Sequence, residues 1–256
     1  MSTGIQWTDE TWNPVTGCSK VSPGCAHCYA ETLALTRLAG KTGYPGLPWT
    51  PENAEANVLL RPDRLRKPLT WKEPRRVFVN SMSDLFHELV PPGYIDEVFS
   101  VMARTPQHSY QVLTKRPERQ RRYMQGRVIR TRPGVDPPLC DEHAIPPNVW
   151  LGTSIENNRF VERADELRNT PSAVRFLSLE PLLGPLPSLI LRDIHWVIVG
   201  GESGPEHRPI RAEWVRDLRD RCLKEHVAFF FKQWDGRTPK SNGRTLDGRT
   251  WDEYPA

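Results

Sequence analysis

The chain has 256 residues, with 35 Lys or Arg against 31 Asp or Glu, so its formal net charge is only +4. Charge alone therefore does not indicate a nucleic-acid partner. The length is enough for a substantial core, and we expect one domain over residues 1–256. No stretch approaches the ~20 apolar residues of a membrane span, and no apolar run precedes the first cysteines as in a signal peptide. We therefore expect no membrane span, and five cysteines without an export signal favour the reducing cytoplasm.

From the N-terminus, the first stretch with distinctive chemistry contains three of the five cysteines in the spacing C-x6-C-x2-C: Cys18, Cys25 and Cys28. Prolines and glycines predict a loop over residues 13–31, and the apolar spacing of residues 30–39 predicts a helix that follows it. The free N–H groups and partial positive charge at a helix N-terminus favour thiolates over thiols. We therefore expect this loop to bind a soft metal or a cluster.

Three thiolates are an unusual number for a closed site, because structural zinc and closed iron–sulfur clusters usually take four ligands. A cubane held by three cysteines leaves one iron open to a small molecule. Zinc completed by a distant residue, or unliganded loop thiols, are the alternatives. Three clustered and two remote cysteines do not suggest a disulfide framework. We favour an iron–sulfur cluster.

Residues 41–74 are rich in proline and lack periodicity, which predicts an irregular excursion over the surface. A regular rhythm follows, in which short apolar runs alternate with helical patterns. The apolar runs are residues 77–79, 110–113, 148–151, 174–177, 196–199 and 227–231, and the helical patterns are 93–104, 117–125, 159–169 and 212–226.

This alternation is typical of parallel strands that are covered on both faces. Together with a possible first strand before Cys18, the runs predict an α/β fold with a (β/α) barrel, complete or partial, of the TIM-barrel kind. A flat doubly wound sheet is the alternative. The lack of a G-x-G-x-x-G motif after the first strand counts against a dinucleotide-binding fold.

Small polar and charged residues follow the apolar runs at their carboxyl ends. In parallel α/β folds this end of the sheet carries the active site, because loops from many strands meet there. One site is therefore predicted, with these candidates: Ser81, Ser83, Asp84, Lys115, Ser154, Glu156, Glu180, Glu202 and Lys232.

Several longer motifs together resemble one family, from about Trp7 to Trp251. They are residues 12–18, 28–31, 80–87, 113–117, 180–185, 199–205 and 230–234. The family is a phage- and prophage-associated three-cysteine family of poorly defined function, usually grouped with radical S-adenosylmethionine (SAM) proteins. The resemblance implies a radical SAM-like barrel with the cluster loop after the first strand.

The resemblance also implies roles for individual residues. Cys18, Cys25 and Cys28 would hold a [4Fe–4S] cluster whose open iron binds SAM, although radical SAM enzymes usually have the shorter spacing C-x3-C-x2-C. The reduced cluster would cleave SAM to a 5′-deoxyadenosyl radical, and an electron donor protein would supply the electron. The cofactor contacts would be Ser81, Ser83 and Asp84 with the methionine part of SAM, and Ser154 and Glu156 with its ribose.

The remaining charged candidates, Lys115, Glu180, Glu202 and Lys232, are expected to act on the substrate as catalytic groups. They have a structural alternative. Lys115, Glu180 and Lys232 could form ion pairs at the barrel mouth, and Glu202 could pair with a nearby arginine, Arg208 or Arg211.

The segment Arg116–Arg132 has the strongest local charge bias of the chain, which suits a nucleic acid or nucleotide. A solvated helix face is equally compatible with it. We expect an insertion over residues 126–147, where Cys140 and His143 have a zinc-like spacing, and a tail over residues 236–256 that folds over the barrel mouth or bottom. A non-enzymatic nucleic-acid-binding module with structural zinc or a structural cluster, and an iron–sulfur enzyme that does not use SAM, are the alternative functions.

Overall fold

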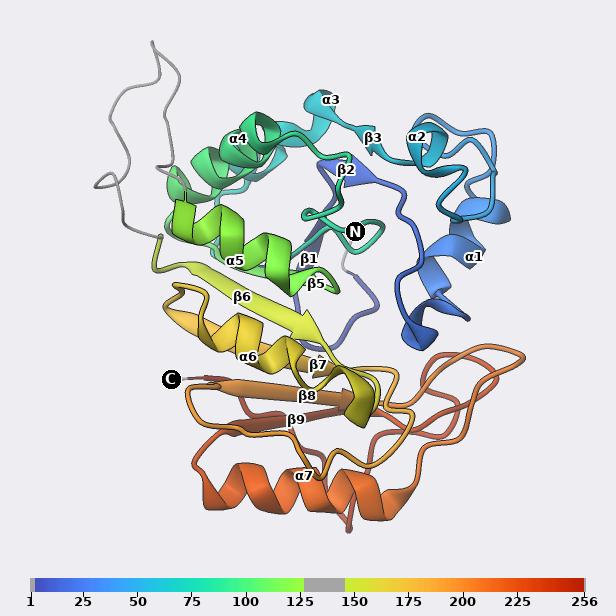
Figure 1. Cartoon of the computed structure of the whole chain (residues 1–256), viewed down its shortest axis with the longest axis vertical. Coiled ribbons are helices and arrows are strands. Elements are labelled where there is room, and N and C mark those ends of the chain that lie inside the picture. The colour runs from blue at the N-terminus through green and yellow to red at the C-terminus, as the bar shows by residue number, and fades with distance from the viewer. Residues whose placement is uncertain (1–2, 127–145, 256) are drawn as a thin grey trace.

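The structure is a computed structural model, which describes residues 3–126 and 146–255. Its centre is a seven-stranded sheet in which all neighbouring strands run parallel (Figure 1). In spatial order the strands are β1 (Glu10–Trp12), β4 (Arg76–Val79), β5 (Ser109–Thr114), β6 (Val149–Ser154), β7 (Val174–Leu179), β8 (Trp196–Gly200) and β9 (Ala228–Gln233). Each predicted apolar run became a strand, and the possible first strand is β1.

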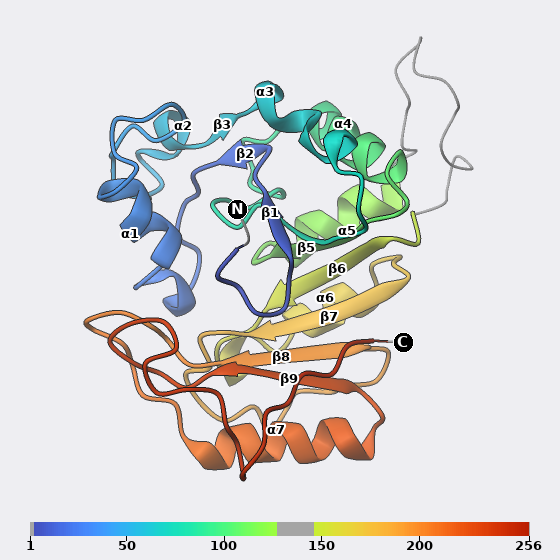
Figure 2. The same ribbon diagram turned by 180° about the vertical axis from the view of Figure 1, so that it is seen from behind.

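The spatial order of the strands follows the chain without reversing. Successive right-handed crossovers in one direction place all their helices on the same face of a sheet. Figures 1 and 2 show α4 (Pro92–Ala103), α5 (Pro117–Gly126), α6 (Arg163–Arg168) and α7 (Ala212–Lys224) around the outside of the curled sheet. The fold is therefore a parallel half-barrel rather than a doubly wound sheet, which would reverse its order. Among the described residues β1 and β9 remain edges, so main-chain pairing does not close a complete barrel.

The region before β4 is more ordered than its proline content predicts. It contains α1 (Tyr29–Leu35) and a small antiparallel sheet of β2 (Val15–Thr16) and β3 (Leu59–Leu60). The remaining short elements are α2 (Ala54–Asn57), α3 (Pro62–Leu65), and the 3-10 turns η1 (Pro23–Cys25), η2 (Lys67–Thr70) and, after β6, η3 (Asn158–Phe160).

Aromatic residues of the predicted excursion explain this order. Tyr44 and Trp49 are buried in a small apolar cluster with Ala30 and Ala34 of α1. Trp49 N also donates to the buried Glu31 carboxylate at 2.8 Å. The excursion therefore packs against the helix that follows the cysteine loop.

A second apolar cluster, separate from the main core between sheet and helices, fills the inner face of the half-barrel near the amino ends of its strands. Its centre is Trp196, whose ring lies 5.7 Å from Phe176 and 6.1 Å from both Trp7 and Phe230. Gly152 makes room for this packing, since a Cβ there would lie 2.5 Å from the Phe176 ring. The inner face thus has an aromatic base below the carboxyl ends of the strands.

The C-terminal tail runs along the edge of β9 and across this base. Phe231 N donates to Trp251 O at 3.0 Å, and the Tyr254 ring lies 5.2 Å from that of Trp196. The Arg76 guanidinium, at the start of β4, lies 4.3 Å from the Tyr254 ring. The last residues of the tail therefore cover the bottom of the half-barrel and link its two sides.

The predicted insertion, including Cys140 and His143, lies almost entirely within residues 127–145, outside the described residues. In the part of the chain that is described, no helix has both the length and the apolar character needed to cross a membrane.

Candidate functional site

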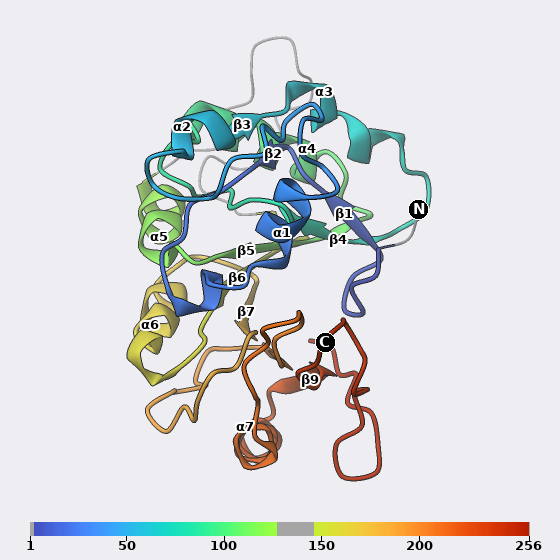
Figure 3. The ribbon, with the colours of Figure 1, turned by 90° about the vertical axis from the view of Figure 1, so that its right-hand side faces the viewer.

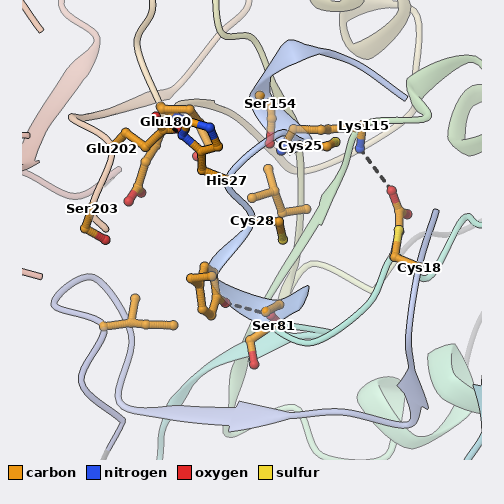
Figure 4. Close-up of a pocket in the computed structure, with 18 of the residues that line it drawn as sticks. Cys18, Cys25, His27, Cys28, Ser81, Lys115, Ser154, Glu180, Glu202 and Ser203 are labelled. Atoms are coloured by element: carbon orange, nitrogen blue, oxygen red, sulfur yellow. Dashed lines mark hydrogen bonds and ion pairs between the residues drawn. The ribbon is translucent and has the colours of Figure 1, made fainter. Parts of the chain in front are cut away.

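A cavity of about 380 Å³ lies at the carboxyl end of the parallel sheet, within the size range of small-molecule sites. Figure 3 looks onto this end of the sheet, where the cysteine loop and α1 also lie. The predicted site residues that line the cavity are Cys18, Cys25, Cys28, Ser81, Ser83, Asp84, Lys115, Ser154, Glu180, Glu202 and Lys232. Figure 4 labels all of these except Ser83, Asp84 and Lys232. Glu156 is not among the cavity-lining residues, and its role as a ribose contact stays a prediction.

The cysteine loop enters α1 as the sequence predicts, with Cys28 at the helix N-cap. The expectation that this position favours thiolates is wrong for the metal-free protein. Burial raises the pKa of Cys18 to about 12 and also raises that of Cys28. Backbone N–H groups of Ala30 and Glu31 act in the opposite direction on Cys28, but burial outweighs them. These thiols therefore stay protonated until a metal displaces the proton.

A buried arginine, Arg116, holds the first cysteine and its neighbour. Its Nη1 lies 3.6 Å from Cys18 Sγ and 3.3 Å from Asp84 Oδ2, and its Nη2 donates to Ser19 O at 3.2 Å. Glu88 accepts from its Nε at 2.9 Å. Burial would lower the pKa of Arg116, but Asp84, Cys18 and Glu88 raise it above its ordinary value. The arginine is therefore a fixed charge inside the protein.

Asp84 organises the turn after β5 as well as holding Arg116. Its carboxylate accepts from Thr114 Oγ1 at 2.7 and 2.9 Å and from Lys115 N at 3.1 Å. These bonds occupy much of the acceptor capacity of Asp84, which the family resemblance assigned to SAM.

A histidine also fixes the start of the cysteine loop. His87 Nε2 lies 2.8 Å from Ser19 Oγ, while Leu89 N donates to His87 Nδ1 at 3.2 Å. Because Nδ1 accepts, the neutral ring carries its proton on Nε2 and donates it to Ser19. Burial lowers the pKa of His87, which favours this neutral form. His87 therefore supports the loop and is not a base for the Ser19 hydroxyl.

Two further carboxylates hold the middle of the loop. Glu156 is buried, pairs with Arg163 Nη1 at 3.1 Å, and accepts from Gly24 N at 3.4 Å. Glu202 accepts from His27 Nδ1 at 3.0 Å and from Arg208 Nε at 2.8 Å.

The ion pair of Glu202 has a second contact with the loop, because Arg208 Nη2 donates to Pro23 O at 3.0 Å. Burial would raise the pKa of Glu202, but Arg208 and His27 hold it below its ordinary value. Glu202 therefore pairs with Arg208, and Arg211 has a different partner in Glu213. Together we call these contacts of Arg116, Glu156 and Glu202 with the loop the loop clamps.

The two serines after β4 face the cavity but already have partners. Ser83 Oγ donates to Val15 O at 2.7 Å, and Ser81 Oγ lies 3.2 Å from Asn13 Nδ2. Tyr29 OH donates to Ser81 O at 2.6 Å. These contacts join the β4 turn to the first strands and to α1.

Lys232 and Glu180 form an ion pair with each other across the cavity wall. The ion pairing that was the structural alternative to a catalytic role is therefore present for these two residues. The side chain of Lys115 differs, since it makes no hydrogen bond or ion pair with any described residue. The same is true of the hydroxyls of Ser154 and Ser178, two buried residues that line the cavity.

The predicted basic stripe is not an open surface where the structure describes it. Arg116 is buried, Arg119 donates to Val90 O at 2.6 Å, and Arg121 pairs with Glu166 at 2.7 Å. Arg122 is exposed and pairs with Glu118. The other arginines of the segment, Arg127, Arg130 and Arg132, lie outside the described residues. The described part therefore gives no support to a nucleic-acid partner at this segment.

The donor chemistry of the cavity suits a thiophilic metal group, because three free thiols face one space and arginine and lysine stand near two of them. Across residues 3–126 and 146–255, no three His, Cys, Asp or Glu side chains are arranged ready to hold a metal ion. The thiols are gathered, but they do not form a ready-made ion site.

Fold and site thus define a parallel α/β half-barrel with a cysteine-lined cavity at its carboxyl edge. The chain belongs to the family described as "Protein of unknown function (DUF5131)", whose model matches residues 2–255. No curated protein and no solved structure matches the chain.

Proposed function

We propose that the protein is an iron–sulfur enzyme in which Cys18, Cys25 and Cys28 hold a [4Fe–4S] cluster with one iron open to SAM. The observation that carries the proposal is the convergence of three free thiols on one cavity at the carboxyl edge of a parallel half-barrel. Parallel barrels place their reactive groups at this edge. The resemblance to phage-associated radical SAM proteins supports the same assignment.

Three cysteines would leave one cluster position for an exchangeable ligand, whereas a closed site would use a fourth protein ligand. When bound and reduced, the cluster would supply the electron for the reductive cleavage of SAM. The protein itself would position the cluster and SAM, shield them from water and balance their charge.

Individual residues have definite parts in this proposal. The loop clamps fix the cysteine loop before any metal binds. Burial raises the pKa of Cys28 overall and the charge of Lys115 acts in the opposite direction, so the Lys115 ammonium lies where it would offset the negative charge of thiolates. Ser81, Ser83 and Asp84 stand at the cavity wall as the proposed contacts of the methionine part of SAM.

Anaerobic purification with iron and sulfide counts tests the proposal. We expect a broad absorbance near ~400 nm and about four irons per chain. Substitution of all three loop cysteines by serine should abolish both signals. The matched control is Cys222→Ala, because Cys222 is buried in α7 away from the cavity and should not alter the iron content.

Other outcomes would favour the remaining functions. A colourless protein that retains zinc would contradict the enzyme and support a binding module with a structural metal. Equal iron in wild type and in the triple serine variant would show that the iron is not held by the loop.

A further inference from the structure

Three polar side chains of the cavity that have no partner among the described residues lie in one row at the carboxyl ends of three adjacent strands. Thr114 of β5 is in register with Thr153 of β6, so the next residues, Lys115 and Ser154, lie at the same level. Ser154 is in turn in register with Ser178 of β7. Neighbouring strands are about 4.8 Å apart, so these three side chains form a continuous row, which we call the donor row.

The donor row has hydrogen-bonding capacity that the rest of the described protein does not use. Ser154 and Ser178 are 2% and 3% exposed, and their hydroxyls have no partner among the described residues. Both serines line the cavity, so their hydroxyls are available to a ligand bound there. Figure 4 shows Ser154 and Lys115 at the same side of the cavity.

The unpaired charges of the cavity indicate whether its ligand is a cation or an anion. Most charged lining residues are neutralised within the described part of the protein: Lys20 by Glu31, Arg116 by Asp84 and Glu88, Lys232 by Glu180, and Glu202 by Arg208. The unpaired charges that remain among the described lining residues are Lys115 in the row and Lys240, which is exposed. Both are cations, so the cavity favours an anion.

The surface beneath the row is apolar. Leu113 lies two residues below Lys115 on β5, which is about 6.6 Å deeper along the strand. Phe78 and Trp7 continue this surface, and their ring centroids are 4.6 Å apart. A ligand bound to the row would therefore place an apolar body on this floor.

We propose that the donor row binds the carboxylate or phosphate of an organic anion, whose flat apolar body packs on Leu113, Phe78 and Trp7, and that this anion is the substrate. Lys115 supplies a charge-assisted hydrogen bond, and the serine hydroxyls bind the other anionic oxygens. The binding of an anion is argued from this row alone. The identification of that anion as the substrate rests on the proposed function.

Ligand-detected NMR titrations of the anaerobically purified, iron-containing protein test the site with phenyl phosphate, benzoate and neutral benzyl alcohol. We expect one or both anions to bind and benzyl alcohol to bind at least about tenfold more weakly, equivalent to about 1.4 kcal/mol. Comparison of phenyl phosphate with benzoate identifies which anionic group the row prefers.

The variants Lys115→Met and Ser178→Ala locate the binding. We expect Lys115→Met to weaken anion binding about tenfold or more and Ser178→Ala to weaken it severalfold, with unchanged thermal unfolding. Lys240→Met removes a cavity cation outside the row and should change binding less than twofold. An equal loss in Lys240→Met and Lys115→Met would reduce the effect to general electrostatics and overturn the site.

Two further outcomes would overturn the assignment. Displacement of the bound anion by SAM would give the row to SAM instead of a substrate. Loss of iron in Lys115→Met with unchanged anion binding would make Lys115 a partner of the cysteines only. Iron counts on the same samples separate the two proposals, since anion binding without iron would contradict the cluster and leave the anion site intact.

Discussion

The two walls of the cavity treat their polar groups in opposite ways. On the cysteine-loop side, buried charges are paired and directed at the loop, as with Arg116 on Cys18 and Ser19, and Glu202 on His27. On the donor-row side, the side chains of Lys115, Ser154 and Ser178 face the cavity without a partner among the described residues. Both walls lie at the carboxyl end of the parallel sheet.

This contrast separates support from binding. A buried polar group with a partner stabilises the fold, and removal of one partner leaves the other desolvated at a substantial cost. A polar group that faces the open cavity without a protein partner makes no hydrogen bond that stabilises the fold, and it is available to a ligand. Stability and binding should therefore respond to different substitutions on the two walls.

Arg116→Met should produce the largest loss of stability. The substitution leaves Asp84 buried without its cation, which costs about 3–5 kcal/mol of unfolding free energy. Urea unfolding of the metal-free protein measures it. Arg122→Met is the matched control, since its pair with Glu118 is exposed and should be worth less than about 0.5 kcal/mol. Similar small effects of both variants would contradict the first loop clamp.

Arg208→Met should have a smaller effect, confined to the middle of the loop. The loss of its bonds to Glu202 and Pro23 O should cost about 1–2 kcal/mol. Amide hydrogen exchange should accelerate around Gly24 and His27. Arg211→Met, whose partner Glu213 is exposed, should leave this exchange unchanged. Unaltered exchange in Arg208→Met would mean that Arg208 does not hold the loop.

The Glu202 clamp should weaken in acid. The pKa of Glu202 in the folded protein lies below its ordinary value of 4.5, so the unfolded chain takes up the proton more readily. The stabilisation, about 1 kcal/mol, is present above pH 4.5 and is lost as pH falls through the folded pKa. The difference in unfolding free energy between wild type and Glu202→Gln should shrink in that range. A constant difference down to pH 3 would refute this origin.

Two serine-to-alanine variants should show the smallest effect and the sharpest contrast. Ser178→Ala removes a hydroxyl without a partner in the described structure and should change unfolding free energy by less than about 0.5 kcal/mol. Ser83→Ala removes a hydroxyl that donates to Val15 O at 2.7 Å and should cost about 1–2 kcal/mol. Equal costs in urea unfolding would erase the distinction between the walls.

The sequence was sufficient to predict the strands and the edge of the sheet at which the cavity lies. Apolar runs such as Trp196–Val199 have enough local pattern to define buried strands, and the polar residues that follow them must meet at the carboxyl edge. Whether β1 pairs with β9 depends on the curl of the whole sheet. Local pattern could not decide between a complete and a partial barrel.

Side-chain partners were the part that sequence could not supply. Arg116 belongs to a basic segment, yet it is buried because Asp84 and Cys18, distant in sequence, surround it. Glu156 and Glu202 likewise contact the cysteine loop across long sequence separations. The order of residues 41–74 depends on Trp49 and Tyr44 packing on α1, which no local period signals.

The most direct test of the central claim is a SAM titration of the reduced, anaerobically purified protein, followed by electron paramagnetic resonance. The account predicts an iron–sulfur signal that changes in shape as SAM binds the open iron, and that is absent from the triple serine variant of Cys18, Cys25 and Cys28. An iron–sulfur signal that SAM leaves unchanged would contradict the open-iron assignment.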